Sequence, residues 1–82
     1  MDAYDARDLG LAIRRLRKRR GWTQVELAEW LGVNPVTVGR LEHGNPVALT
    51  IAMRAISLLG AKVVIVPRTT RVSLEPEEPR GG

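Results

Sequence analysis

Two short helices joined by a tight turn are indicated over residues 22–44, and this pattern constrains the fold more than any other feature of the chain. Thr23 has the position of an N-cap for the first helix, because a glutamate follows three residues later and completes a capping box. Gly32 stands where a left-handed residue ends a helix. Asn34 then caps a second helix, and Pro35 takes its first position, where a missing N–H costs nothing. The spacing therefore predicts a helix-turn-helix.

Apolar side chains at helical spacing give both of these helices a face to bury. The first helix shows Leu27, Ala28 and Leu31, and the second shows Val38 and Leu41, so each has one apolar stripe. The positions outside these stripes are the ones that a ligand can reach. In the second helix and its cap, these outward residues are Asn34, Pro35, Val36, Thr37, Gly39 and Arg40.

The same stretch resembles the Cro/C1 (XRE) helix-turn-helix family. The resemblance combines the box TQVELA at 23–28 with the ending R-x-E-x-G at 40–44, and it extends over residues 9–59. It implies a mainly α, lambda-repressor-like domain of four to five helices that binds double-stranded DNA. It also implies that Arg17 pairs with Glu42, a structural ion pair that would hold the recognition helix against the first helix of the chain.

The outward face of the second helix of the motif is the expected DNA-reading surface, and the six outward residues are DNA-binding candidates. Arg40 either donates two hydrogen bonds to guanine O6 and N7 or contacts a phosphate. Val36 can contact a thymine methyl group. Thr23 and Gln24 open the preceding helix, whose free N–H groups can face phosphates. Asn45, in the loop that follows, is a further phosphate-contact candidate.

The composition of the 82-residue chain narrows its class to one small domain. Hydrophobic residues make up 44% and aromatic residues only 4%, which favours an aliphatic core. With no cysteine and one histidine, the sequence offers neither a disulfide framework nor a zinc site. It also lacks a cysteine nucleophile, a histidine–carboxylate cluster and a phosphate-cradling loop, so we expect neither enzyme activity nor a cofactor.

Charge and hydropathy predict the surroundings in which the protein works. The net charge of +4 and the pI near 10.7 favour a polyanionic partner. No apolar run approaches the roughly 20 residues that span a membrane. The acidic start of the sequence does not look like a signal segment. We therefore expect a cytoplasmic protein.

Two further helices are predicted, one on each side of the motif. The first is capped by Asp5 and ends at Gly21. Its outer faces carry six basic residues, Arg14, Arg15, Arg17, Lys18, Arg19 and Arg20. These residues form a solvated face, contact phosphates or dock against an acidic partner. The last helix runs from about residue 47 or 48 to residue 59. Its expected inner face consists of Leu49, Ala52, Met53, Ile56 and Leu59.

Two further side chains, Trp30 and His43, lie in or next to the motif but outside its apolar stripes. Trp30 lies on the flank of the apolar stripe of its helix. It is either an anchor for a partner protein or a side chain that packs over the first helix or under the C-terminal segment. His43 is expected to be solvated.

A β-branched run follows the last helix and predicts a strand, formed by Lys62, Val63, Val64, Ile65 and Val66. Four helices leave no second strand in the chain, so we expect this strand to pair with its copy across a two-fold axis. The alternative is a hydrophobic extension folded back on the core. Residues 67–82 hold three prolines and little apolar content, which predicts a disordered tail behind a domain of residues 1–66.

A strand after four helices is similar to the HipB-type antitoxin subgroup, whose dimers carry an intersubunit β-ribbon. This resemblance implies a homodimeric repressor that binds a palindromic operator and also a toxin partner, a HipA-like kinase. Two other interpretations stay open, a stand-alone transcriptional regulator and a coactivator-like protein-interaction module. Nonspecific nucleic-acid binding is the fallback, and it predicts salt dependence with little sequence preference.

Overall fold

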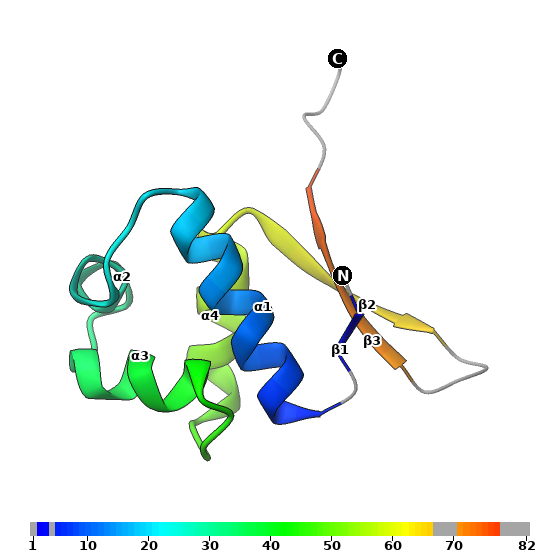
Figure 1. Cartoon of the computed structure of the whole chain (residues 1–82), viewed down its shortest axis with the longest axis horizontal. Coiled ribbons are helices and arrows are strands. Elements are labelled where there is room, and N and C mark those ends of the chain that lie inside the picture. Colours follow the sequence, from blue (N-terminus) through cyan, green and yellow to red (C-terminus); the bar gives the residue numbers. More distant parts are fainter. Residues whose placement is uncertain (1, 4, 67–70, 78–82) are drawn as a thin grey trace.

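The computed structural model describes residues 2–3, 5–66 and 71–77, which form four helices beside a small antiparallel sheet (Figure 1). The helices are α1 (Ala6–Arg19), α2 (Gln24–Leu31), α3 (Pro35–Glu42) and α4 (Leu49–Leu58). The strands are β1 (Asp2–Ala3), β2 (Ala61–Val66) and β3 (Arg71–Pro76). In Figure 1, α2 and α3 lie on the side of the molecule away from the sheet. The mainly helical fold that the sequence predicts is confirmed, and a helix-turn-helix lies within it.

Local hydrogen bonds set the boundaries of α2 and α3. The Thr23 hydroxyl accepts the Glu26 N–H at 3.1 Å, and the Glu26 carboxylate accepts the Thr23 N–H at 3.0 Å, which completes the predicted capping box. At the start of α3, Asn34 Oδ1 accepts the Val36 N–H at 2.8 Å. Gly32 ends α2 at a φ of 69°, a left-handed conformation that is costly for residues with a Cβ atom. These caps fix the short turn between the two helices.

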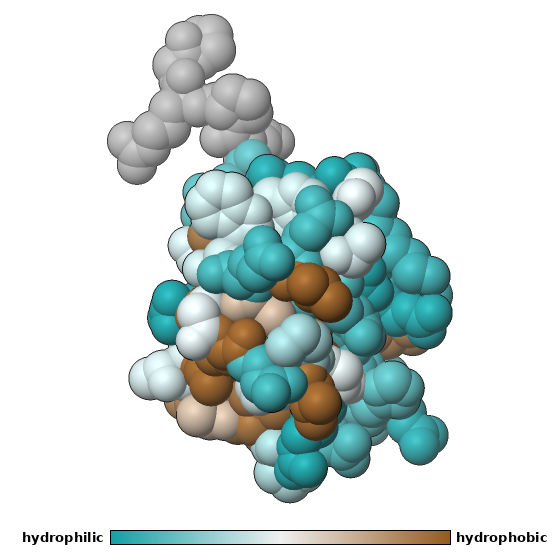
Figure 2. All heavy atoms as spheres, turned by 90° about the vertical axis from the view of Figure 1, so that its left-hand side faces the viewer, coloured by the Kyte–Doolittle hydropathy of each residue, from teal (hydrophilic) through white to brown (hydrophobic). Residues whose placement is uncertain are grey.

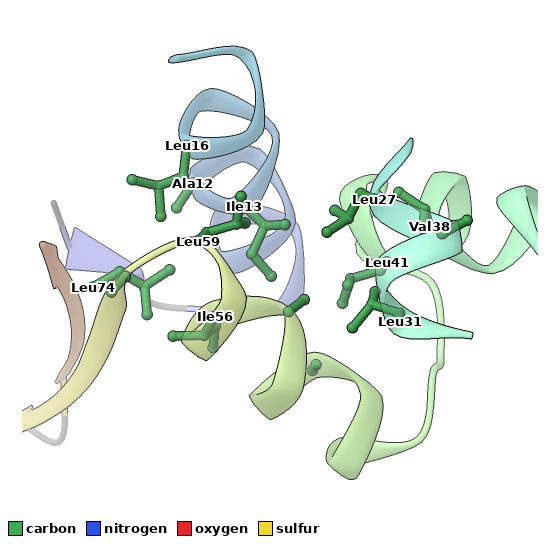
Figure 3. Packing of buried hydrophobic residues seen from close by; sticks show 14 residues of the cluster. Ala12, Ile13, Leu16, Leu27, Leu31, Val38, Leu41, Ile56, Leu59 and Leu74 are labelled. Atoms are coloured by element: carbon green, nitrogen blue, oxygen red, sulfur yellow. The ribbon is translucent and has the colours of Figure 1, made fainter. Parts of the chain in front are cut away.

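Aliphatic side chains from all four helices and from β3 meet in one core (Figure 3). The largest fully buried side chains are those of Ile13, Leu27, Leu31, Val38 and Leu74. Three of these come from the stripes that the sequence predicts for α2 and α3. Burial of each such side chain contributes about 1.5–3 kcal/mol, so the motif is held mainly by its inward faces.

α4 buries a different face from the one that its sequence predicts. Ala52, Ile56 and Leu59 are buried as expected. Leu49 is 74% exposed and Met53 is 47% exposed, so the prediction is wrong for these two residues. Apolar side chains cover more than one face of this helix, and its periodicity therefore does not single out the face that is buried.

β3 lies at the centre of the sheet, and β1 and β2 pair with it on either side in antiparallel directions. Val63 of β2 lies opposite Leu74 of β3, and Leu74 is buried against the core. The prediction that the chain has no second strand is therefore wrong. The expected disorder is also wrong for residues 71–77, because they form β3 and its end. The alternation of Val72 and Leu74 is short and stops at Pro76, which weakens the strand signal in the sequence.

The folded unit continues past the predicted domain boundary at residue 66. Beyond β3, the Glu77 N–H donates to the Gly60 carbonyl at 2.7 Å. The rest of the expected tail, 67–70 and 78–82, lies outside the described residues. Because β3 occupies one side of β2, β2 is an edge strand of this sheet. A second copy of the chain would have to pair with the outer edge of β2.

Candidate nucleic-acid interface

The outer face of α3 and the N-terminal end of α2 form one surface on the side away from the sheet. Figure 2 shows this side of the molecule, where hydrophobic residues gather in the lower half and hydrophilic residues surround them. Val36 is 67% exposed, whereas Val38 and Leu41 point into the core. α3 therefore presents apolar and charged side chains together on a surface that solvent can reach.

A shallow hollow of about 440 Å³ lies on this surface, lined by Gln24, Pro35, Val36, Gly39, Arg40, His43 and Asn45. Six of these seven are residues that the sequence proposes as DNA contacts. The other three candidates do not line the hollow. Thr23 and Asn34 are the N-caps of α2 and α3, and Thr37 is half-buried. The hollow thus brings together groups from the start of α2, from α3 and from the following loop.

His43 belongs to this surface, although the sequence gives it no role beyond solvation. It is the C-cap of α3, and its ring Nδ1 lies 2.7 Å from the Gly39 carbonyl oxygen. Because a carbonyl only accepts, Nδ1 carries the hydrogen and Nε2 is left for another partner. The sequence signal for this position is the spacing of His43, which follows Gly39 by four residues and Arg40 by three and therefore lies on the same face of the helix.

A buried ion pair holds the surface in place from beneath. Arg17 Nε donates to Glu42 Oε2 at 2.6 Å and Arg17 Nη2 donates to Glu42 Oε1 at 3.0 Å, as the family resemblance implies. Arg17 Nη1 also donates to the Trp22 carbonyl at 2.7 Å. The amide Nε2 of Gln24 donates to Glu42 Oε1 at 3.1 Å. This network ties α1 to the end of α3, and it positions the side chain that opens α2.

Arg40 stands at the edge of the hollow with its side chain exposed. Its Nη2 donates to the Pro46 carbonyl at 3.3 Å, a long hydrogen bond at the surface. Such a bond contributes little to stability in water, so an acceptor on a ligand can replace it. The guanidinium fork is therefore accessible for bidentate binding.

Trp30 stacks on Trp22, with ring centroids 6.1 Å apart and an angle of 21° between the planes. The Arg20 guanidinium carbon lies 5.5 Å from the centroid of the Trp22 ring on which it sits. Trp30 nevertheless keeps 63% of its surface exposed. Its ring partner Trp22 lies between α1 and α2, and therefore belongs neither to the first helix nor to the C-terminal segment against which the alternative places Trp30. Its role as a partner anchor stays a prediction.

The five residues predicted for dimerisation, Lys62, Val63, Val64, Ile65 and Val66, all fall in β2. Lys62 is exposed, and Val63 and Val64 are half-buried. In the sheet they lie opposite residues of β3 in the same chain. The structure thus places them in a strand, with one edge already paired.

Two further properties of the described residues bear on function. None of their helices combines the length and the apolarity that a membrane crossing requires. No cluster of three or more His, Cys, Asp or Glu side chains among them could hold a metal ion.

Two capped helices around a short turn, with the second helix exposed, define the class as a helix-turn-helix domain. The sequence profile of the family described as "Helix-turn-helix domain" matches residues 8–64, which is more than half of the chain. The chain belongs to this family. The match supports the broader helix-turn-helix resemblance and does not extend to the HipB-type subgroup.

The chain is also similar to the competence pilus inhibition repressor of Acinetobacter baylyi. The two sequences are 47% identical over 38 residues, which is 46% of this chain and 34% of that protein. The chain thus spans about a third of the length of the curated relative that it matches.

Proposed function

We propose that this protein is a sequence-specific DNA-binding transcriptional repressor. The observation that carries the proposal is the hollow on α3, where Arg40 and Val36 are exposed beside Gln24. The net charge of +4 favours a polyanionic partner. Membership of the helix-turn-helix family supports DNA binding. Similarity to a protein named as a repressor supports repression as the outcome.

In this proposal α3 enters the major groove with its N-terminal half toward the base edges. Arg40 donates two hydrogen bonds to guanine O6 and N7, which discriminates against a wrong base pair by roughly 1–3 kcal/mol. Val36 contacts a thymine methyl group. Gln24 and Asn45 flank the hollow and bind phosphates, which fixes how α3 sits in the groove. The hydrogen bond from Gln24 to Glu42 orients the Gln24 side chain before DNA arrives.

The proposed repressor acts as a homodimer. Among the described residues no strand occupies the outer edge of β2, so β2 of a second copy can pair there across a two-fold axis. Two α3 helices about 34 Å apart would then read half-sites one helical turn apart in a palindromic operator. The dimer thereby doubles the contacts that a single domain makes.

We further propose that the repressor is a HipB-like antitoxin that also binds a toxin, a HipA-like kinase. The support is the order of four helices followed by a strand, which is similar to that subgroup. Co-expression with the protein encoded beside it tests this point. Co-purification and relief of growth arrest are expected, and a neighbour that neither binds nor arrests growth would leave a stand-alone regulator.

A coactivator-like protein-interaction module is the second candidate function. The observation that favours it is the exposed Trp30 stacked on Trp22, because exposed tryptophans often anchor protein partners. This function does not require Arg40 or Val36, since neither belongs to the tryptophan pair. The two candidates therefore differ in which substitutions abolish binding.

Selection of binding sites from random DNA duplexes by the full chain tests the proposal. We expect an enriched sequence, and we expect Arg40→Ala to weaken binding to it by about 5- to 150-fold for each half-site, which corresponds to 1–3 kcal/mol per contact. Base preference should relax at one position of each half-site. Arg54→Ala is the matched control, because Arg54 is an exposed arginine of α4 outside the hollow. Absence of any enriched sequence, or equal effects of the two substitutions, would contradict the proposal.

A further inference from the structure

α1 carries a second groove beside the hollow on α3. Its volume is about 540 Å³, and α1 contributes Arg7, Leu11 and Arg14 to its lining. Gln24 and His43 line it as well, together with the buried ion pair described above. The proposed contacts of α3 with DNA do not use this groove, although its basic residues belong to the most positively charged helix of the chain.

The groove and the hollow share a border. Gln24 and His43 line both of them, so one continuous surface runs from α3 to α1. A rigid duplex lying over the hollow has to continue beyond it in both directions. The groove on α1 is next to the hollow at this shared border, where the backbone of such a duplex can reach it.

The charge of the groove is positive. Arg7 and Arg14 are both exposed and stand seven residues apart, which places them on one face of α1 about 10 Å apart along its axis. Leu11 lies between them and is 40% exposed. Among the described residues that line the groove, the one carboxylate belongs to Glu42, and its two oxygens already accept hydrogen bonds from Arg17 and Gln24.

We propose that this groove binds the phosphate backbone of the operator duplex, beyond the base pairs that α3 reads. Arg7 and Arg14 each neutralise one phosphate, and Leu11 packs against the sugar between them. Contacts of this kind position the protein and carry no sequence information. The inference rests on the proposed DNA-binding function and adds a second contact region, on α1, to that function. An acidic polypeptide is the competing occupant.

The salt dependence of DNA binding tests this assignment. Each neutralised phosphate contributes about 0.9 to the slope of log K against log salt concentration. Arg7→Gln combined with Arg14→Gln should therefore reduce the slope by about 2 for each bound copy of the chain, and by about 4 for a bound dimer. Between 50 and 200 mM salt, the affinity of the unmodified chain should fall about tenfold more than that of the double variant for each bound copy. The ratio of affinities for the selected and an unrelated duplex should stay unchanged, which separates this effect from that of Arg40→Ala.

Arg15→Gln combined with Lys18→Gln is the matched control. It removes the same charge from exposed positions of the same helix, and neither residue lines the groove. Equal slope changes in the two double variants would overturn the proposal, because they would reflect diffuse charge. Unchanged DNA binding in the Arg7/Arg14 variant would overturn it as well and favour an acidic polypeptide. If the unmodified chain selects no sequence, the proposed DNA-binding function itself is contradicted. If the chain selects a sequence but the salt slope does not change in the Arg7/Arg14 variant, only the proposal for the groove is contradicted.

Discussion

Glu42 is the residue on which the geometry of the candidate interface depends most. It belongs to α3, yet it accepts hydrogen bonds from Arg17 of α1 and Gln24 of α2. The side chains of Arg17 and Glu42 are only 8% and 1% exposed. At such burial neither charge can be left without its partner, because water cannot replace the lost hydrogen bonds.

Glu42→Ala should lower the free energy of unfolding by about 3–5 kcal/mol, because it strands the buried Arg17 guanidinium. Chemical denaturation followed by circular dichroism measures this change. Glu29→Ala is the control, since Glu29 is an exposed glutamate of α2, and we expect a change within about 0.5 kcal/mol there. Replacing both partners, with Arg17→Met and Glu42→Met, should recover much of the loss. A loss below about 1 kcal/mol for Glu42→Ala would mean that the pair behaves as an exposed one.

At the scale of elements, the backbones of α1 and α3 lie close together at Gly10. A Cβ atom at this position would lie 2.6 Å from the Glu42 carbonyl oxygen, which belongs to the backbone and cannot move aside. α3 contains a glycine of its own, Gly39, in the hollow. A Cβ atom there would lie 3.9 Å from the Gln24 side chain, an ordinary contact distance. A methyl group therefore fits at Gly39 but not at Gly10.

The same substitution at these two glycines should have opposite effects on stability. Gly10→Ala should lower the free energy of unfolding by about 1–3 kcal/mol, because α1 and α3 are forced apart. Gly39→Ala should raise it by up to about 1 kcal/mol, because alanine favours the helix and meets no obstacle. Thermal unfolding of the two variants measures both changes, and each variant serves as the control for the other. Destabilisation by Gly39→Ala would show that α3 needs this glycine for its own structure.

At the scale of the whole molecule, the features that could be predicted from the sequence are those set by interactions between residues close together in the chain. The caps at Thr23 and Asn34 and the turn at Gly32 were predictable, because the signals lie within a few residues of each other. These signals define where α2 and α3 begin, and the outward residues that line the hollow could be predicted from those helix boundaries. His43 was missed, since its role depends on the surface that α3 and the next loop form together.

The pairing of the sheet could not be predicted from the sequence. β3 gains its stability from pairing with β2 and from burying Leu74 against the helices. Neither of these contacts is visible in a segment that contains few apolar residues. The exposure of Leu49 and Met53 has a similar cause, because only the packed molecule decides which of several apolar faces of α4 is buried.

The paired β2–β3 sheet changes the expectation for the oligomer, because the dimer no longer follows from an unpaired strand. It follows instead from an edge strand, and edge strands of β-branched residues readily pair with another chain.

We expect the full chain to have a solution mass of twice 9.1 kDa. In an antiparallel β2 pair across a two-fold axis, Val64→Lys would bring like charges close together and favour the monomer. Val25→Lys, the same change at an exposed valine of α2, should leave the dimer intact. Sedimentation equilibrium measures all three masses. A monomeric full chain would remove the two-fold axis and with it the palindrome, while the DNA contacts proposed for α3 and α1 would still apply to a single site.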